Sequence, residues 1–327
     1  MPLSLDVLTV GNAIVDIFAR CDDAFLADRD IGKGMMNLVD ADRSASLYAD
    51  IADAREISGG SAANTAVGIV ALGGKAGFAG RVHDDELGHS FIRDIAAAGV
   101  HFGAPPQQDG SPTASSIILV TPDASRSMNT YLGACIEFQP DDIREDEVAA
   151  SKVIYLEGYL FDAPEGPSIF ARAAEIAEQS GAQLALSLSD SWCVERHFEA
   201  LKEFVKNHVT MLFCNEDEII SLGQTDVHGS VALVSNWVDE LVVTKGAAGA
   251  DILKGDKQVS VPAMPCGEVV DTTGAGDLFA SGYLFGRVTG ASILKSAELA
   301  SLCAGEIICH FGARPQLNLK DFIAKVN

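Results

Sequence analysis

The stretch Asp271-Thr272-Thr273-Gly274-Ala275-Gly276-Asp277 is followed by the apolar run 278–285. Small residues just before an apolar helical run leave several backbone N–H groups at a helix N-terminus, and these donors, together with the helix dipole, bind anions. Asp277 falls in the first turn, where a carboxylate beside a phosphate can accept the proton of an attacking hydroxyl. The stretch therefore predicts a phosphoryl-transfer site. The alternative interpretation is that Asp277 caps the helix and the glycines only form a turn.

Short apolar runs alternate with amphipathic segments along most of the chain. Strands that alternate with helices of this length are typical of a parallel sheet covered on both faces, so we predict an α/β fold. The expected strands are 6–10, 75–80, 152–156, 183–188, 210–213 and 241–244, and the expected helices are 61–72, 165–179, 192–206, 227–237, 291–311 and 319–326.

Two segments, 18–37 and 111–132, do not follow this alternation. The first is polar without a clear period, and the second alternates around a Pro-Asp turn, which is typical of a β-hairpin. We expect residues 1–327 to form one domain in which these two segments build a small β lid over the carboxyl ends of the main strands. The alternative is that both are ordinary insertions.

Composition and charge narrow the class of protein. The 327 residues are 48% hydrophobic and carry a net charge of -23, which indicates a folded chain that repels nucleic acids and anionic membranes. The first residues lack a basic stretch followed by an apolar core, which predicts no signal peptide, and no apolar run approaches a membrane span. Seven cysteines without a C-x-x-C pair favour a reducing compartment, so we expect a cytoplasmic protein.

The stretch that ends at Asp277 closely resembles the C-terminal signature of the ribokinase-like (PfkB-type) carbohydrate and nucleoside kinases. Three further motifs follow the order of that family: 59–66, which opens a helix, 215–218, which matches N-x-x-E, and 243–249, which matches the nucleotide-side strand end. The resemblance implies a ribokinase-like fold with a central, mostly parallel sheet, flanking helices and a small β-sheet lid. A Walker A loop is absent, which excludes a P-loop kinase.

The resemblance also implies the roles of the residues around the transferred group. Asp277 would be the base, and the N–H groups of Gly274, Ala275 and Gly276 would stabilise charge on the phosphoryl group. ATP would be the donor, with Mg²⁺ bridging its phosphates, and many relatives are activated by K⁺ beside the loop 271–273.

Asn12 and Asp16 flank the end of the first strand, where ligands gather in open parallel sheets. Their amide and carboxylate suit the hydroxyls of a ribose, and two adjacent glycines allow the backbone to approach a ligand closely. The alternative is that these polar residues are turn and cap residues. The resemblance assigns Asn12, Asp16, Gly60 and Asn64 to the hydroxyls of the acceptor's sugar, and Gly59 and Ser61 are expected to bind the acceptor with them.

On the nucleotide side, Asn215 and Glu218 are three residues apart and therefore share a helix face. An amide and a carboxylate there can organise a hydrated Mg²⁺, whereas the alternative is an acidic helix start favoured by the dipole. Small residues would leave room for the adenine, although close packing explains them as well. The residues expected to bind the nucleotide are Asn215, Thr244, Gly246, Gly249, Ala304 and Gly305.

Segments 11–17, 23–26 and 33–37 resemble adenosine kinases more than ribokinases. Tyr159 follows a strand where adenosine kinases place an aromatic residue against the acceptor's base, and Met36 would add an apolar wall. Phe161 is the second candidate for the stack, but we expect it in the core. Arg126 resembles a family arginine near the phosphates; the alternative is an exposed lid arginine without a role.

These assignments lead to an ATP-dependent kinase that phosphorylates the 5′-hydroxyl of adenosine, as a monomer or homodimer. The first alternative is a kinase of ribose, fructose or a keto-deoxy sugar acid. An acidic sugar would need an arginine in the pocket, and the sequence indicates none there. The second alternative is a regulator that binds ligand without turnover, against which the intact Asp277 and anion loop argue.

Overall fold

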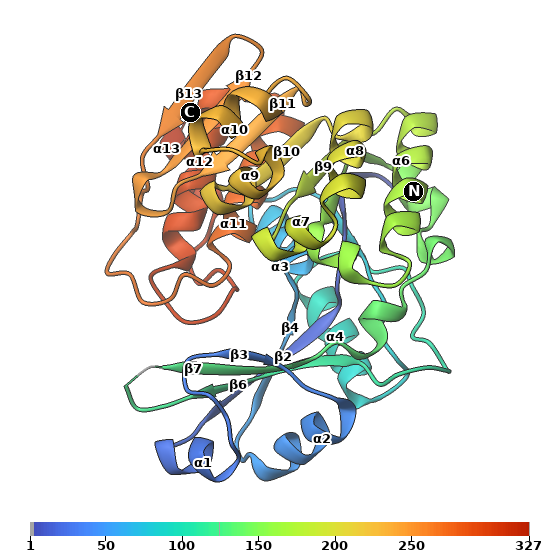
Figure 1. Cartoon of the computed structure of the whole chain (residues 1–327), viewed down its shortest axis with the longest axis vertical. Coiled ribbons are helices and arrows are strands. Elements are labelled where there is room, and N and C mark those ends of the chain that lie inside the picture. Colours follow the sequence, from blue (N-terminus) through green and yellow to red (C-terminus); the bar gives the residue numbers. More distant parts are fainter. Residues whose placement is uncertain (1–2, 124, 327) are drawn as a thin grey trace.

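The computed structural model describes residues 3–123 and 125–326, which form a large α/β body and a smaller sheet beside it (Figure 1). The chain passes from the body, through β1 (Leu5–Val10), into the smaller sheet at β2 (Ile14–Arg20). It returns from β4 (Arg55–Gly59) into the body at α3 (Ser61–Ala71). Two of the expected substrate-binding segments therefore lie where the chain passes between the two parts.

The large sheet of the body has eight strands in the order β13-β12-β11-β10-β9-β8-β1-β5. The six strands from β11 to β5 are parallel, and β12 and β13 form an antiparallel hairpin at one edge. The mostly parallel sheet predicted from the sequence is confirmed. The remaining strands are β5 (Ala76–Ala79), β8 (Ser151–Glu157), β9 (Gln183–Ser187), β10 (Met211–Asn215), β11 (Glu240–Thr244), β12 (Ala250–Lys254) and β13 (Lys257–Val261).

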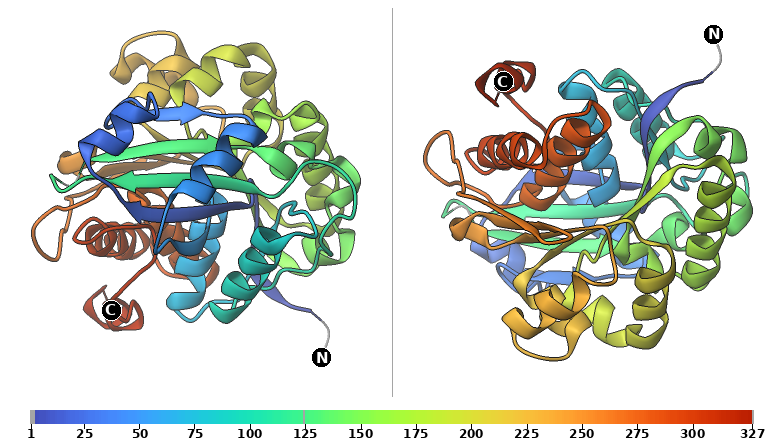
Figure 2. Two further views of the ribbon diagram at one scale, coloured as in Figure 1. Left: turned by 90° about the horizontal axis from the view of Figure 1, so that it is seen from below. Right: turned by 90° about the horizontal axis from the view of Figure 1, so that it is seen from above.

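Helices cover both faces of this sheet, as Figure 2 shows. One face carries α3, α4 (Glu86–Ala97), α11 (Ala275–Val288) and α12 (Ile293–Ile307). Helix α11 packs on α3 and α12, and α13 (Lys320–Val326) packs on α12. Each face has its own cluster of buried apolar side chains, because β1 and β8 turn alternate residues to opposite sides. The other face carries α5 (Glu145–Ala149), α6 (Gly166–Ser180), α7 (Ser191–Arg196), α8 (Phe198–His208), α9 (Glu216–Gly223) and α10 (Val227–Val234).

The smaller sheet has the order β3-β7-β6-β2-β4. It includes β3 (Met36–Leu38) and the antiparallel pair β6 (Ala114–Val120) and β7 (Arg126–Tyr131), which lie in the two segments expected to form the lid. It is wider than that expectation, because β2 begins at residue 14 and β4 adds an edge strand. Helices α1 (Asp23–Asp28) and α2 (Ala41–Asp50) lie on the side away from the body (Figure 1).

Strand register shows which residues of the smaller sheet face the body. Val15 and Ile17 are buried with side chains of α1 and α2, so the alternate residues Asp16 and Phe18 point to the opposite side. Residues directly paired on neighbouring strands share a face. We call this side the inner face. It comprises Asp16, Phe18, Ser116, Ile118, Met128, Thr130, Met36 and Leu38.

Two local expectations differ from the structure. The helix expected over 192–206 is two helices, α7 and α8, with a break at His197. The β12–β13 hairpin was not expected, although Gly255-Asp256 between two short strands is a recognisable signal for a two-residue hairpin loop.

Candidate active site

Asp277 lies in the first turn of α11, where the preceding Gly274 takes a left-handed conformation with φ 78°. Its carboxylate accepts hydrogen bonds from Ser61 Oγ at 2.6 Å and Asn64 Nδ2 at 2.9 Å. Burial raises the pKa of Asp277, while these two bonds and the charge of Arg314 lower it. The structure therefore brings Ser61 and Asn64 onto the candidate base, where they hold its two oxygens in place.

The start of α11 offers backbone donors to an anion. Within the described residues no side chain caps this helix. Ala275 N–H donates to Thr272 O at 3.2 Å, so its donor is used within the turn. Gly276 is exposed and lines the neighbouring cavity, which leaves the N-terminus of the helix open to a phosphate.

Residues 59 and 60 must be glycines, because atoms of Asp16 and Asn12 lie where a side chain would begin. A methyl group on Gly59 would lie 2.4 Å from Asp16 Oδ2, and one on Gly60 would lie 2.1 Å from Asn12 O. Gly60 also has φ 95°, which side chains rarely allow. Desolvation raises the pKa of Asp16 to about 6, with Arg314 and Arg126 opposing the shift.

A buried glutamate that the sequence analysis missed organises Asn12. Glu157, the last residue of β8, accepts from Asn12 Nδ2 at 3.1 Å and from Ala62 N–H at 2.8 Å. Asn12 Oδ1 is buried and has no partner among the described residues, so this oxygen is free to accept a substrate hydroxyl. Burial raises the pKa of Glu157 to about 7. The available signal was an acidic residue ending a strongly apolar strand.

Arg314 is the second residue that the sequence analysis missed. It donates through Nη1 to Asn64 Oδ1 at 2.9 Å, and through Nη2 to Ser58 Oγ at 2.7 Å and to Ser58 O. The sequence did not indicate an arginine here, and the structure places this one beside Asn64, a residue expected to bind the acceptor. Sequence reasoning missed it because Arg314 and Asn64 are 250 positions apart.

Arg126 connects the smaller sheet with the loop before α11. Its Nη1 donates to the Asp271 carboxylate and, at 2.7 Å, to Thr273 Oγ1. Its side chain is only 13% exposed, so the alternative of an exposed arginine without contacts is wrong. Nε and Nη2 of Arg126 are buried and have no hydrogen-bond partner among the described residues.

A cavity of about 480 Å³ opens beside the start of α11. A methyl group on Gly305 would lie 1.8 Å from Met264 O, so close packing with residue 264 also requires this glycine. The cavity adjoins the backbone at the start of α11, because Ala275 and Gly276 line it. Of the residues expected to bind the nucleotide, Thr244, Gly246, Gly249, Ala304 and Gly305 line it.

Asn215 and Glu218 do not line this cavity. Glu218 accepts from Asn215 N–H at 3.0 Å and Nδ2 at 2.6 Å, and Asn215 Oδ1 accepts from Glu218 N–H at 2.9 Å. The pair is a capping box at the start of α9, and burial raises the pKa of Glu218 to about 7. These contacts are the ones expected from the alternative interpretation, in which Asn215 and Glu218 form the start of a helix.

The two expected base-binding residues lie on different parts of the molecule. Tyr159 lies in the 3-10 helix Gly158–Asp162 after β8 and is 43% exposed, and burial of its hydroxyl raises its pKa, with nearby carboxylates such as Asp190 and Glu157 adding to the shift. Met36 is 61% exposed on the inner face of the smaller sheet. Phe161 is buried against Phe170, which confirms its place in the core.

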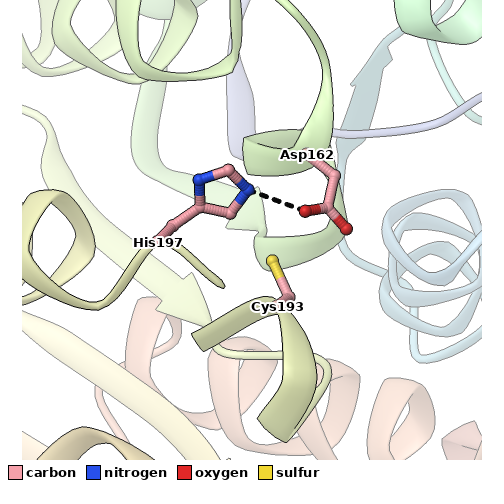
Figure 3. Close-up of side chains that lie close together, drawn as sticks. All are labelled: Asp162, Cys193 and His197. Atoms are coloured by element: carbon pink, nitrogen blue, oxygen red, sulfur yellow. Dashed lines mark hydrogen bonds and ion pairs between the residues drawn. The ribbon is translucent and has the colours of Figure 1, made fainter. Parts of the chain in front are cut away.

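Figure 3 shows a cluster of Asp162, Cys193 and His197 outside this site. These residue types can bind a metal ion, but here they are satisfied by one another and by their neighbours. Asp162 accepts from His197 Nε2 at 2.7 Å and from Arg196, and Cys193 Sγ donates to Gly158 O at 3.3 Å. Burial raises the pKa of Cys193 to about 12, which keeps the thiol protonated. The cluster joins α7 to the segment after β8.

A model of the pfkB family of carbohydrate kinases matches residues 31–319. The chain belongs to this family. This pfkB kinase is therefore a phosphotransferase that acts on an alcohol group, and its ribokinase-like fold is confirmed. The family implies ATP as donor, typically with Mg²⁺. In the part of the chain that the structure describes, no helix is both long and apolar enough to cross a bilayer.

Both nucleoside and sugar kinases are similar to this pfkB kinase. A probable sugar kinase from Rhizobium etli is 46% identical, with a TM-score of 0.89 over 99% of this chain and 98% of that chain. An adenosine kinase from Sinorhizobium meliloti is 45% identical, with a TM-score of 0.89 over 99% and 100%. The adenosine kinase of Saccharomyces cerevisiae is 26% identical over 95% of this chain and 96% of that protein.

Proposed function

We propose that this pfkB kinase transfers the γ-phosphoryl group of ATP to the 5′-hydroxyl of a nucleoside, with adenosine as the preferred acceptor. The observation that carries the proposal is the group of apolar side chains on the inner face of the smaller sheet. Phe18, Met128 and Met36 share that face with Asp16, at the side turned to the body. A flat base is stabilised by such a surface, whereas a free sugar presents hydroxyls that need polar partners.

The remaining parts of the site fit the two ends of a nucleoside. Asp16 and the free Oδ1 of Asn12 are acceptors for ribose hydroxyls. Tyr159 presents an exposed aromatic ring on the body. The base of a nucleoside whose ribose is bound by Asn12 and Asp16 would have this ring as a neighbour. The 45% identical adenosine kinase supports the same acceptor.

The chain's own groups perform the proton transfer and stabilise charge. Asp277 would accept the proton of the 5′-hydroxyl, while Ser61 and Asn64 hold its carboxylate in one orientation. The N–H groups at the start of α11 and the free donors of Arg126 would bind the transferred phosphoryl group. Exclusion of water is needed because water competes as an acceptor.

The Mg²⁺ and K⁺ sites are proposed separately from the acceptor. Mg²⁺ would neutralise charge on the phosphates when bound, and Asn215 and Glu218 would hold its water shell after leaving their capping arrangement. A K⁺ site is proposed beside residues 271–273, where Asp271 is now paired with Arg126. Dependence of the rate on each cation tests both assignments.

A sugar kinase is the second candidate, and the 46% identical probable sugar kinase supports it. An acidic sugar is less well supported, because Arg314 already donates to Asn64 and Ser58 and lies among three carboxylates.

With adenosine as acceptor, the enzyme would serve purine salvage. The cysteine usage supports a cytoplasmic location, and either a monomer or a homodimer is compatible with the site.

The deciding experiment compares adenosine, ribose and fructose as acceptors for the wild type and Tyr159→Ala. We expect kcat/KM for adenosine to exceed that for either sugar by at least about tenfold, since stacking a base on an aromatic ring is worth roughly 1–3 kcal/mol. Tyr159→Ala should raise KM for adenosine and leave activity on ribose unchanged. Trp192→Ala, a 71% exposed aromatic residue, is the matched control. A wild type that prefers ribose or fructose would contradict the nucleoside assignment.

A further inference from the structure

Arg314 lies in the segment that joins α12 to α13, and this segment is held firmly against the site. Gly312 N–H donates to Asp271 Oδ2 at 3.2 Å, and Ala313 packs so closely on Gly274 that a methyl group there would lie 2.8 Å from it. Further along, Glu306 Oε1 accepts from the backbone N–H groups of Gln316 and Leu317 at 2.8 and 2.9 Å. The position of the Arg314 backbone is therefore set from both sides.

The guanidinium of Arg314 determines which way the Asn64 amide points. Arginine only donates hydrogen bonds, so the Asn64 atom within 2.9 Å of Nη1 must be the carbonyl oxygen Oδ1. The amide nitrogen Nδ2 is then turned to Asp277 Oδ2, to which it donates at 2.9 Å. Without Arg314 the amide could rotate and present its oxygen to the carboxylate, which would repel it.

The same guanidinium holds the end of β4. Its Nη2 donates to Ser58 Oγ at 2.7 Å and to Ser58 O, next to the glycines that carry the chain from the smaller sheet to α3. Ser58 is fixed in turn by Asp94 of α4, which accepts from its backbone N–H at 2.8 Å. One side chain thus connects the smaller sheet, α3 and, through Asn64, the start of α11.

We propose that Arg314 is a positioning residue that fixes the orientation of Asn64 and keeps the Asp277 carboxylate ionised and aimed at the acceptor hydroxyl. The proposal rests on the proposed role of Asp277 as base. It assigns Arg314 no direct contact with the acceptor, since Nη1 donates to Asn64 and Nη2 donates to Ser58.

The charges around Arg314 and Asp277 support the same proposal. Arg314 interacts with Asp94, Asp16 and Asp277, and its positive charge lowers the pKa of Asp277. With that charge removed, burial and the neighbouring carboxylates would raise the pKa of Asp277 further. The titratable groups that face Asp277 or Arg314 are Asp16 of β2, Asp94 of α4, Tyr155 and Glu157 of β8, and Tyr159 of the following 3-10 helix.

The test compares Arg314→Gln, which loses the charge, with Arg314→Lys, which keeps the charge but loses the forked geometry. The first readout is the carboxyl ¹³C titration of Asp277, assigned by its loss in Asp277→Asn. We expect Arg314→Gln to raise the titration midpoint by about one pH unit and Arg314→Lys to shift it much less. This readout needs no acceptor, so it tests the proposal even if adenosine is not the substrate.

The second readout is turnover of adenosine and ATP across pH. Arg314→Gln should lower kcat by roughly 10- to 100-fold, move the acid limb of its pH profile upward, and leave KM for ATP unchanged. Arg287→Gln is the matched control, because Arg287 lies on α11, the helix of Asp277, and its Nε and Nη2 donate to buried Glu240 at 3.0 and 2.8 Å. It should lower the Tm without changing the pH profile.

Two results would overturn the proposal. One is an Asp277 titration midpoint that is the same in Arg314→Gln as in the wild type. The other is a fall in kcat with an unchanged pH profile, matched by the loss in Arg287→Gln, which would show that Arg314 only stabilises the fold. Failure of wild-type turnover with adenosine, beside a shifted midpoint, would count against the proposed acceptor alone.

Discussion

Asp277 combines burial with two directed donors, and this combination is costly for stability but useful for proton transfer. Desolvation raises its pKa, whereas Ser61 and Asn64 favour the ionised form. A base needs this balance, because it must be ionised before the reaction and must bind a proton during it. The residues that hold Asp277 come from α3, which is more than 200 positions away in the sequence.

Asp277→Asn should abolish most turnover while binding of ATP changes little. Removal of a general base usually lowers kcat by on the order of 10²–10⁴-fold, and the loss of a buried charge should leave the Tm equal or higher. The measurements are kcat with the preferred acceptor, calorimetric ATP binding and thermal unfolding. Asp84→Asn, at an exposed carboxylate, is the control. Turnover within a few-fold of the wild type would exclude Asp277 as the base.

The attachments of the smaller sheet to the body include the short connections at residues 11–13 and 60, the ion pair between Arg126 and Asp271, and the hydrogen bonds of Arg314 to Ser58. Its inner face carries Met36 and Leu38, which are 61% and 66% exposed. Exposed apolar side chains beside a substrate site favour closure over a bound ligand, because closure removes them from water. The sheet is therefore suited to move as one element.

We expect amide exchange in β3, β6 and β7 to slow when adenosine binds, since closure would shield the inner face and exclude water from the phosphoryl group. Hydrogen exchange followed by mass spectrometry measures this directly. Helix α6, on the far side of the body, should exchange at the same rate with and without adenosine. Equal exchange of the three strands at saturating adenosine would contradict a mobile lid.

Acidic groups govern how the whole molecule responds to pH. The net charge is -23, and burial raises the pKa of Asp16 to about 6 and that of Glu157 to about 7. A carboxyl group whose folded pKa is raised stabilises the fold fully below its unfolded pKa, and this contribution is lost as pH rises through the folded pKa. Both groups therefore make the free protein more stable at pH 5.5 than at pH 8.

The expected difference in the free energy of unfolding between pH 8 and pH 5.5 is on the order of 1–3 kcal/mol. Urea unfolding at the two pH values measures it, and repeating both in high salt removes the general repulsion between surface carboxylates. Asp16→Asn should reduce the difference that remains in salt. A protein that is equally stable at both pH values would contradict the raised pKa values of Asp16 and Glu157.

Local patterns in the sequence predicted most strands and helices and the glycine-rich start of α11, and the family resemblance added several of the residues that line the cavity beside it. These features depend on neighbours within a few positions, such as apolar periodicity, glycines before a helix and small side chains after a strand. The same patterns were ambiguous for Asn215 and Glu218, because a capping box and a cation site use the same residues at the same spacing.

Only the tertiary structure shows which charged side chains lie close to Asp277, the candidate base. Glu157 is an acidic residue at the end of an apolar strand, and Arg314 lies in an irregular segment after the last long helix, so no local pattern indicates which residues either one contacts. Their roles arise because the parallel sheet brings distant strand ends to one edge, and because the segment after α12 returns across the start of α11. The inner face of the smaller sheet likewise depends on the register of four strands, which no single segment specifies.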